Sequence, residues 1–244
     1  MTLAAPAAAV TGTLTINPIT AAWSDVTGTT PTFSGTNTSP TIRWGTSTGS
    51  GRSGYNFSSA AVPLDVNYVV DGAGETFDLG TFTHFNNPIT GGSITGARLT
   101  ITYGVSVNGG AVTNYSSVFR LLHDETPNGS DPCAFGGAND QGVNVNGCAD
   151  RVRIGLLAGA SESFEIDGIE YFLDIDGFFA NNTLVNQFLT VERKDNQAVL
   201  RGAIVAASAL GPGGVPEPGT WAMMLLGFGA VGIAARRRSA VVAA

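Results

Sequence analysis

The sequence predicts an all-β protein: an antiparallel two-sheet sandwich of jelly-roll type, followed by a linker and one C-terminal transmembrane helix. Three observations support this. Short runs of alternating apolar and polar residues predict strands, and Gly, Asn, Asp or Pro occupies nearly every gap between them. No internal stretch of helical length keeps a 3.6-residue period with capping residues. A parallel sheet is disfavoured because its connections need crossover helices.

The predicted strands run along the whole body of the chain. Alternation is plainest in residues 98–107, where every second residue shares one apolar face: Leu99, Ile101, Tyr103, Val105 and Val107. Similar runs occur at residues 12–16, 41–44, 66–70, 76–84, 112–122, 151–157, 163–166, 169–175, 188–192 and 198–206. About ten strands in one body of this length are typical of two antiparallel sheets packed face to face.

Composition supports one globular domain with distinct ends. The chain has 244 residues, 43% of them hydrophobic and only 13% charged, and a body of about 200 residues can bury a sizeable core. We expect the β-sandwich domain to span residues 10–206. Residues 207–215, which include the sequence Gly-Pro-Gly-Gly, are predicted to be a flexible linker.

The charge of the body argues against nucleic acid as a partner. Three of the 12 basic residues form the cluster Arg236, Arg237 and Arg238, and all 19 acidic residues precede that cluster. The body therefore carries nine basic and 19 acidic groups, a net charge of −10. Phosphate binding needs clustered Lys and Arg. An acidic body also stays soluble and is repelled by anionic lipid.

The C-terminal region predicts a membrane helix. Residues 219–235 are 17 residues without a charge, which gives a helix of about 25 Å, at the short end of what spans a bilayer. Trp221 is expected at one interface, with Arg236, Arg237 and Arg238 on the cytoplasmic side. The alternative is a buried amphipathic helix, but the stretch has no polar face.

The same region resembles a known sorting signal. The tripeptide Pro216, Glu217 and Pro218 precedes Trp221 and Ala222, and the apolar stretch and arginine cluster follow. Residues 216–244 thereby resemble the PEP-CTERM signal in its PEPxxWA variant. The resemblance implies an exported protein of a Gram-negative bacterium that makes exopolysaccharide. It also implies processing near the tripeptide by an exosortase, with transient membrane anchoring beforehand. Residues 239–244 run on further than is usual in that family.

The N-terminus is less complete than such a protein needs. Residues 1–9 contain Ala7 and Ala9 in a pattern typical of a signal peptidase site, but no basic segment and no long apolar core. We interpret residues 1–9 as the remnant of an export signal.

The two cysteines fit an oxidising compartment. Cys133 and Cys148 are the only cysteines and enclose 14 residues rich in Gly and Asn. A disulfide between them predicts an exported protein; the alternative is two free buried thiols. A zinc site is disfavoured because the chain offers two cysteines and two histidines distant in sequence.

The body resembles a second family, the choice-of-anchor K domain, over about residues 75–205. The resemblance rests on the segments 82–89, 118–128, 147–150, 164–173 and 177–178. It implies an extracellular module with no known reaction, so no catalytic residue is transferred from it.

The segment 124–150 is a candidate metal site. It is rich in Asp and Asn, whose oxygens suit calcium, and the candidate ligands are Asp124, Asp131, Asp140 and Asp150. The spacing matches no EF-hand, and such loops also arise from turn chemistry alone. No other cofactor is predicted.

The remaining candidates for chemistry have simpler explanations. We expect His84 and Asn86 to tie a strand end to the turn at Pro88, and His123 to lie in a surface turn. Residues 45–49 match G-x-S-x-G, but the helix that a hydrolase needs does not follow.

The sequence therefore predicts a non-enzymatic surface protein of the envelope or exopolysaccharide matrix. Two alternatives stay open. One is a carbohydrate-binding module, with or without calcium, that uses exposed members of the aromatic set Trp23, Trp44, Tyr55 and Tyr115, although burial is expected for most of them. The other is a polysaccharide hydrolase with a carboxylate pair drawn from Glu165, Asp167, Glu170, Asp174 and Asp176.

Overall fold

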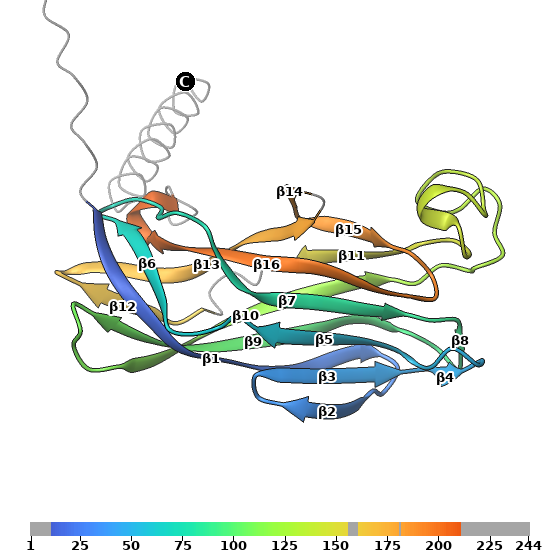
Figure 1. The fold of residues 1–244 in the computed structure, drawn as a ribbon, viewed down its shortest axis with the longest axis horizontal. Coiled ribbons are helices and arrows are strands. Elements are labelled where there is room, and N and C mark those ends of the chain that lie inside the picture. Colours follow the sequence, from blue (N-terminus) through green and yellow to red (C-terminus); the bar gives the residue numbers. More distant parts are fainter. Residues whose placement is uncertain (1–10, 156–160, 181, 211–244) are drawn as a thin grey trace, which may run out of the picture. The chain divides into compact units, whose positions relative to one another are not determined.

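The computed structural model describes residues 11–155, 161–180 and 182–210. The chain divides into two compact units, residues 1–209 and 210–244. All described residues except Leu210 belong to the first unit, and the fold below is that of this unit (Figure 1).

The first sheet has six antiparallel strands. Their spatial order is β15 (Gln187–Thr190), β11 (Asp150–Gly155), β10 (Thr113–Asp124), β9 (Ile94–Val107), β1 (Thr11–Gly28) and β6 (Leu64–Val69). The strand β9 holds the centre, and its pairing with β10 runs from Val105 opposite Thr113 to Gly96 opposite Leu122.

The second sheet has eight strands. Seven follow the spatial order β12 (Ser163–Ile166), β13 (Ile169–Ala180), β16 (Lys194–Ala206), β7 (Phe77–Asn86), β5 (Ser53–Ser59), β3 (Ser39–Trp44) and β2 (Thr32–Thr36). The eighth, β14 (Thr183–Val185), pairs with β13. A small separate ribbon joins β4 (Thr46–Ser47) to β8 (Ile89–Thr90).

The predicted antiparallel all-β class with two sheets is confirmed. Each of the 11 predicted runs overlaps an observed strand, although residues 156 and 157 of one run lie outside the described residues. Five strands were missed: β2, β4, β5, β8 and β14. Four of them are short edge or ribbon strands. The fifth, β5, is rich in Ser and Gly, a composition that is typical of turns.

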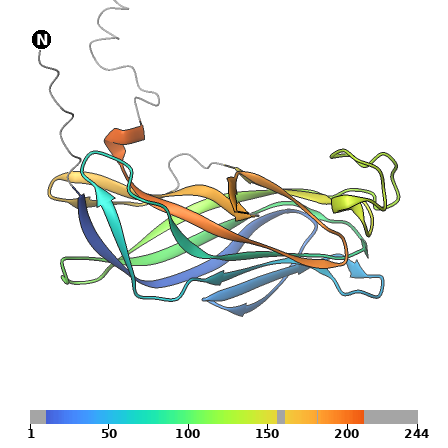
Figure 2. The same ribbon diagram turned by 45° about the horizontal axis from the view of Figure 1, so that its top comes forward.

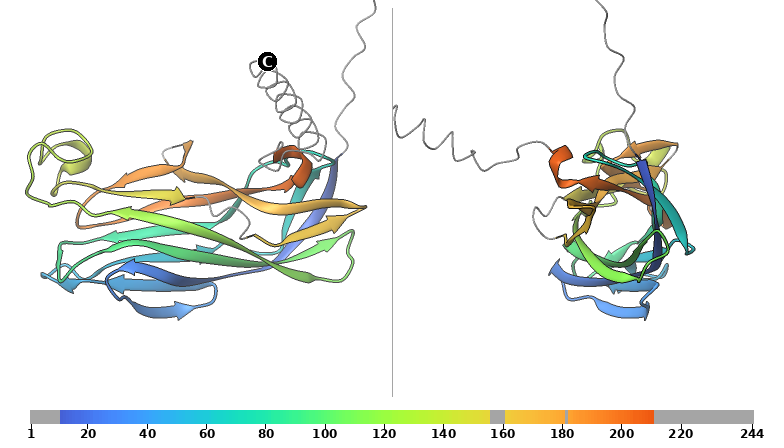
Figure 3. Two further views of the ribbon diagram at one scale, coloured as in Figure 1. Left: turned by 180° about the vertical axis from the view of Figure 1, so that it is seen from behind. Right: turned by 90° about the vertical axis from the view of Figure 1, so that its left-hand side faces the viewer.

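The two sheets curl around a shared apolar core (Figures 2 and 3). Trp23 of β1 packs against Tyr55 of β5 and Phe82 of β7, with ring centroids 5.7 and 6.3 Å apart. The Trp23 indole donates a 2.9 Å hydrogen bond to the carbonyl of Pro40. The face predicted for residues 98–107 is confirmed at four of its five positions, because Leu99, Ile101, Tyr103 and Val105 are buried, whereas Val107 is half-buried.

Helical structure is minor within the described ranges. It comprises two 3₁₀ turns, η1 (Gly142–Asn144) and η2 (Ala207–Leu210). The second occupies the first four residues of the predicted linker. No helix in the described part of the chain is long and apolar enough to cross a membrane. The predicted span 219–235, the arginine cluster and the export-signal remnant 1–9 lie outside the described residues.

Several loops lie together at one end of the body, which we call the loop end. The loop between β10 and β11, drawn yellow-green in Figure 1, lies at the same end as the β4–β8 ribbon and the start of β16. The strand β16 begins there, with Lys194 opposite Asn86 of β7, and runs to Ala206 at the other end of the body. The chain therefore leaves the body far from this loop end.

Candidate functional site: a cationic pocket at the loop end

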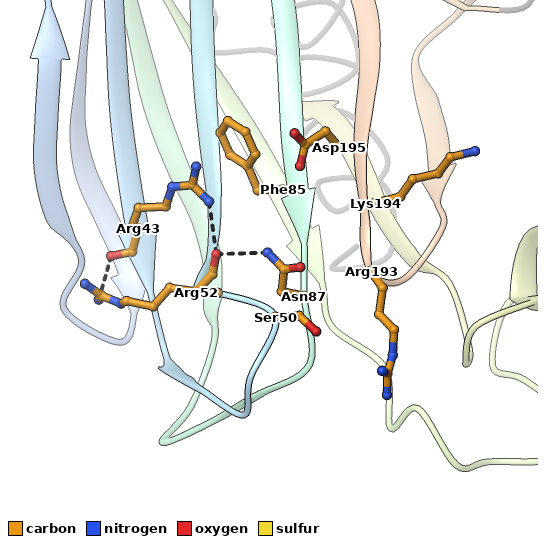
Figure 4. A pocket seen from close by; sticks show the side chains of 9 residues that line it. Arg43, Ser50, Arg52, Phe85, Asn87, Arg193, Lys194 and Asp195 are labelled. Carbon is orange, nitrogen blue, oxygen red and sulfur yellow. Dashed lines mark hydrogen bonds between the residues drawn. The ribbon is translucent and has the colours of Figure 1, made fainter.

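A pocket of about 930 Å³ opens at the loop end of the body. It is lined by residues of the strands β3, β7 and β16 and of the segments that precede β5, follow β7 and precede β16: Arg43, Ser50, Gly51, Arg52, Phe85, Asn87, Arg193, Lys194 and Asp195. Figure 4 shows Arg43 and Arg52 on one side, Arg193 and Lys194 on the other, and Phe85 between them. Its volume is in the range of small-molecule and cofactor pockets.

The pocket concentrates positive charge on an acidic protein. Four of the nine basic residues that precede the C-terminal cluster line it, against one carboxylate, Asp195. Within the described ranges none of these four forms a salt bridge, whereas Arg98, Arg151, Arg153 and Arg201 all pair with aspartates. The pocket thus holds cationic charge that no neighbouring carboxylate compensates through a direct ion pair.

Arg43 lies over an aromatic ring at the centre of the pocket. Its guanidinium carbon is 3.5 Å from the centroid of Phe85, a cation–π arrangement. Its Nη1 also donates to the carbonyl of Arg52 at 3.0 Å. A Cβ at residue 54 would overlap with Cδ of Arg43, so only glycine at that position lets Arg43 cross β5. Burial lowers the pKa of Arg43, and Asp195 opposes that shift.

Arg52 has a mainly structural role. Its guanidinium donates to the carbonyls of Gly45 and Arg43 and to Oγ1 of Thr32, each at 2.9 Å. Its own carbonyl accepts a 3.2 Å hydrogen bond from the side chain of Asn87. Arg52 thereby braces the pocket wall, and the exposed side chains of Arg193 and Lys194 are left to meet a ligand.

This arrangement can bind an anion that also carries hydroxyl groups. Guanidinium groups recognise carboxylates through charge-assisted, often bidentate, hydrogen bonds. The side chain of Asn87 and the hydroxyl of Ser50 add neutral donors and acceptors. Sequence reasoning missed this pocket, although Arg193 and Lys194 are adjacent in a chain poor in cations.

The predicted calcium ligands are not brought together. Asp124 is engaged by Arg151 and Arg153, with nitrogen–oxygen distances of 2.9 and 3.0 Å. Asp131 accepts from the backbone of Asn139 at 3.2 Å, and Asp140 is exposed with a φ of 60°. Of the four, only Asp150 joins a group of possible metal ligands within the described residues.

The predicted disulfide is present. Cys133 and Cys148 are bonded and close the loop between β10 and β11, 15 residues apart in sequence. Both residues are buried. The alternative of two free thiols is therefore wrong.

Breaking the disulfide is expected to lower the free energy of unfolding by about 3 kcal/mol, because a closed loop of this length limits the unfolded chain. Urea denaturation of the full chain with and without dithiothreitol measures this difference. The Cys133→Ser/Cys148→Ser double variant is the control, since reductant should leave its stability unchanged. Equal stability of the oxidised and reduced wild type would contradict the expectation.

The two histidines correct the sequence prediction. His84 does not reach the turn at Pro88; its Nδ1 lies 2.9 Å from Oγ1 of Thr190. His123 does not lie in a surface turn; it is 3% exposed, with Nδ1 at 2.6 Å from the Tyr55 hydroxyl. The fold brings the two imidazole centroids to 5.1 Å, although they are 39 positions apart in sequence.

The other sequence candidates occupy ordinary positions. Trp23, Trp44 and Tyr55 are buried and Tyr115 is half-buried, so burial of most of this set is confirmed. Glu165 and Glu170 face each other across the β12–β13 hairpin and are exposed.

Comparison with known proteins identifies the C-terminal segment. The family model of the PEP-CTERM protein-sorting motif matches residues 214–238. The match includes Pro216, Glu217, Pro218, Trp221, Ala222 and the three arginines 236–238. No curated protein matches the chain. The motif implies exosortase-dependent sorting of an exported protein that is tied to the envelope.

Proposed function

We propose that this protein is a non-enzymatic component of the cell surface that holds acidic exopolysaccharide in the cationic pocket at its loop end. The observation that carries the proposal is the gathering of Arg43, Arg193 and Lys194, without salt bridges among the described residues, around Phe85. A carboxylate-bearing saccharide supplies the missing counter-charge, and its ring offers an apolar face to the aromatic side chain.

The geometry of the body supports this role. The strand β16 spans 13 residues between the pocket and the exit of the chain toward the sorting motif, a distance of about 40 Å in extended conformation. A body held near its C-terminal end would keep the pocket well away from the point of attachment. Transient anchoring through residues 219–235 and processing near Pro216 belong to this proposal.

The resemblance of residues 75–205 to the choice-of-anchor K domain agrees with an extracellular binding module. Calcium is not required in this proposal, because neither group of possible metal ligands among the described residues includes Asp124, Asp131 or Asp140. Hydrolysis is not proposed either, since Glu165 and Glu170 lie on an exposed hairpin rather than in the pocket.

A binding titration tests the proposal. The full chain in mild detergent is titrated with alginate, a carboxylated polysaccharide, and with neutral dextran, with and without calcium. We expect calcium-independent binding of alginate, which weakens as salt rises, and none of dextran. The Arg193→Glu/Lys194→Glu variant should bind alginate about tenfold more weakly, equivalent to about 1.4 kcal/mol.

A matched variant separates the pocket from general charge. Arg98→Glu/Arg120→Glu changes the net charge by the same amount, on the first sheet, and should keep wild-type affinity. Equal weakening in both variants would show that binding depends on net charge alone. Absence of alginate binding by the wild type would refute the proposal outright.

A further inference from the structure

A cluster of buried acceptor groups lies between the two sheets, beneath the loop end. His84 comes from β7 of the second sheet, whereas His123 is the next-to-last residue of β10 and Asp150 begins β11 of the first sheet. One ligand atom from each of the three lies within 4.8 Å of the others. His84 and Asp150 are 0% exposed and His123 is 3% exposed.

The hydrogen bonds around His84 fix its tautomer. The hydroxyl of Thr190 donates to the carbonyl of Asp150 at 3.3 Å. Its oxygen is therefore left to accept from Nδ1 of His84 at 2.9 Å. A neutral imidazole that donates through Nδ1 carries its lone pair on Nε2. That Nε2 is buried and has no hydrogen-bond partner within the described residues.

Asp150 presents a second unpartnered acceptor. Its Oδ1 accepts from the backbone and the hydroxyl of Thr126 at 2.8 and 3.2 Å. Its Oδ2 is buried and has no partner in the described part of the chain. The same holds for Oδ1 of the neighbouring residue Asn86. Three buried acceptors without a donor are costly, because each loses its hydration without compensation.

The carboxylates of this cluster form no salt bridge with Lys or Arg among the described residues, and Oε2 of Glu125 lies 3.2 Å from Nε2 of His123. Glu125 and Glu192 form a second group of possible ligands with Asp150, and none of the three pairs with a Lys or Arg among the described residues.

We propose that His84, His123 and Asp150 bind a divalent metal ion of the zinc class, which ties the two sheets together beneath the disulfide loop. Two imidazoles and one carboxylate are a typical zinc ligand set. Imidazole nitrogen suits zinc and its neighbours in the first transition row, whereas calcium prefers six to eight oxygens. Glu125 is placed to supply a further oxygen.

The surroundings resemble the outer shell of a structural metal site. Thr190 holds the Nδ1 of His84, and the Tyr55 hydroxyl contacts Nδ1 of His123 at 2.6 Å. Such outer partners orient metal-bound imidazoles. Glu125 also lines a pocket of about 340 Å³ together with Ser93 and Asn128. The burial of the ligands favours a stabilising role over a catalytic one.

Zinc titration of metal-free full chain tests the site. After dialysis against a chelator, calorimetry is expected to find one tight equivalent of zinc and a higher melting temperature in its presence. His84→Gln and Asp150→Asn should each bind zinc more than about a hundredfold more weakly, since a ligand matters at least as much as an outer-shell partner. The Asp131→Asn/Asp140→Asn variant removes exposed carboxylates and should bind like the wild type.

Two further measurements keep the test decisive. Thr190→Val should weaken zinc binding about 10- to 100-fold through the orientation of His84, and Thr190→Ser should restore it. When cobalt replaces zinc, its visible absorption spectrum should be that of a cobalt ion with few ligands, some of them nitrogen atoms. This measurement needs no variant to fold.

Three outcomes would overturn the proposal. The first is a folded, metal-free wild type that takes up no zinc, as expected if a water molecule fills the cluster. The second is zinc binding by both His84→Gln and Asp150→Asn with the affinity of the wild type, which would place the metal elsewhere. The third is oxygen-only coordination of cobalt.

Discussion

Replacing Pro216, Glu217 and Pro218 with alanine is expected to abolish sorting while leaving the body folded. The substitution removes the tripeptide from the matched motif but retains the apolar stretch 219–235 and the arginine cluster. A segment that is still apolar and still flanked by arginines keeps its affinity for the bilayer. We therefore expect the variant to accumulate unprocessed in the inner-membrane fraction.

Fractionation of cells that express the native gene measures this effect, with immunoblotting of each fraction for location and size. Pro212→Ala is the matched control, because it changes a proline just outside the matched residues 214–238. It should distribute like the wild type. Wild-type distribution of the triple-alanine variant would mean that the tripeptide is not what the sorting machinery reads.

The second large effect concerns the core between the sheets. Phe82 is 0% exposed and its ring contacts Trp23, Tyr55, Phe178 and Phe188, with centroids 4.9–6.3 Å away. Phe82→Ala removes these contacts and leaves a cavity, so we expect it to lower the free energy of unfolding by about 3–5 kcal/mol. Urea denaturation of the full chain measures the change.

Phe33→Ala provides the comparison, because Phe33 lies on the edge strand β2 and is 59% exposed. The same chemical change there is expected to stay within about 0.5 kcal/mol. If both substitutions lowered the free energy of unfolding by similar amounts, Phe82 would not be a core residue as described.

The alternation of apolar and polar residues predicted the strands that have one buried face and one solvent-exposed face. The strand β9 is the clearest case, since Leu99, Ile101 and Tyr103 alternate with polar residues and all three are buried. The strand β5 was missed for the opposite reason. Its sequence, Ser-Gly-Tyr-Asn-Phe-Ser-Ser, has the composition of a turn, and only its place between β3 and β7 makes it a strand.

Long-range contacts explain why the sites were harder to predict. His84 and His123 look unrelated in sequence, and the meeting of β7 and β10 across the core is what brings their rings together. Arg43 and Arg193 likewise reach one pocket only because β3 and β16 lie in the same sheet. By contrast, the sorting motif is a linear signal, so its residues could be identified from the sequence alone.

We propose that sorting delivers the protein to the surface and that the pocket then holds acidic polysaccharide. The most direct measurement compares the amount of protein that remains with the extracellular polysaccharide after low-salt washing. Wild type and Arg193→Glu/Lys194→Glu both carry an intact sorting motif and should be processed equally. We expect the wild type to stay in the polysaccharide fraction until high salt releases it, while the variant appears in the first wash. Equal retention of the two proteins would contradict it.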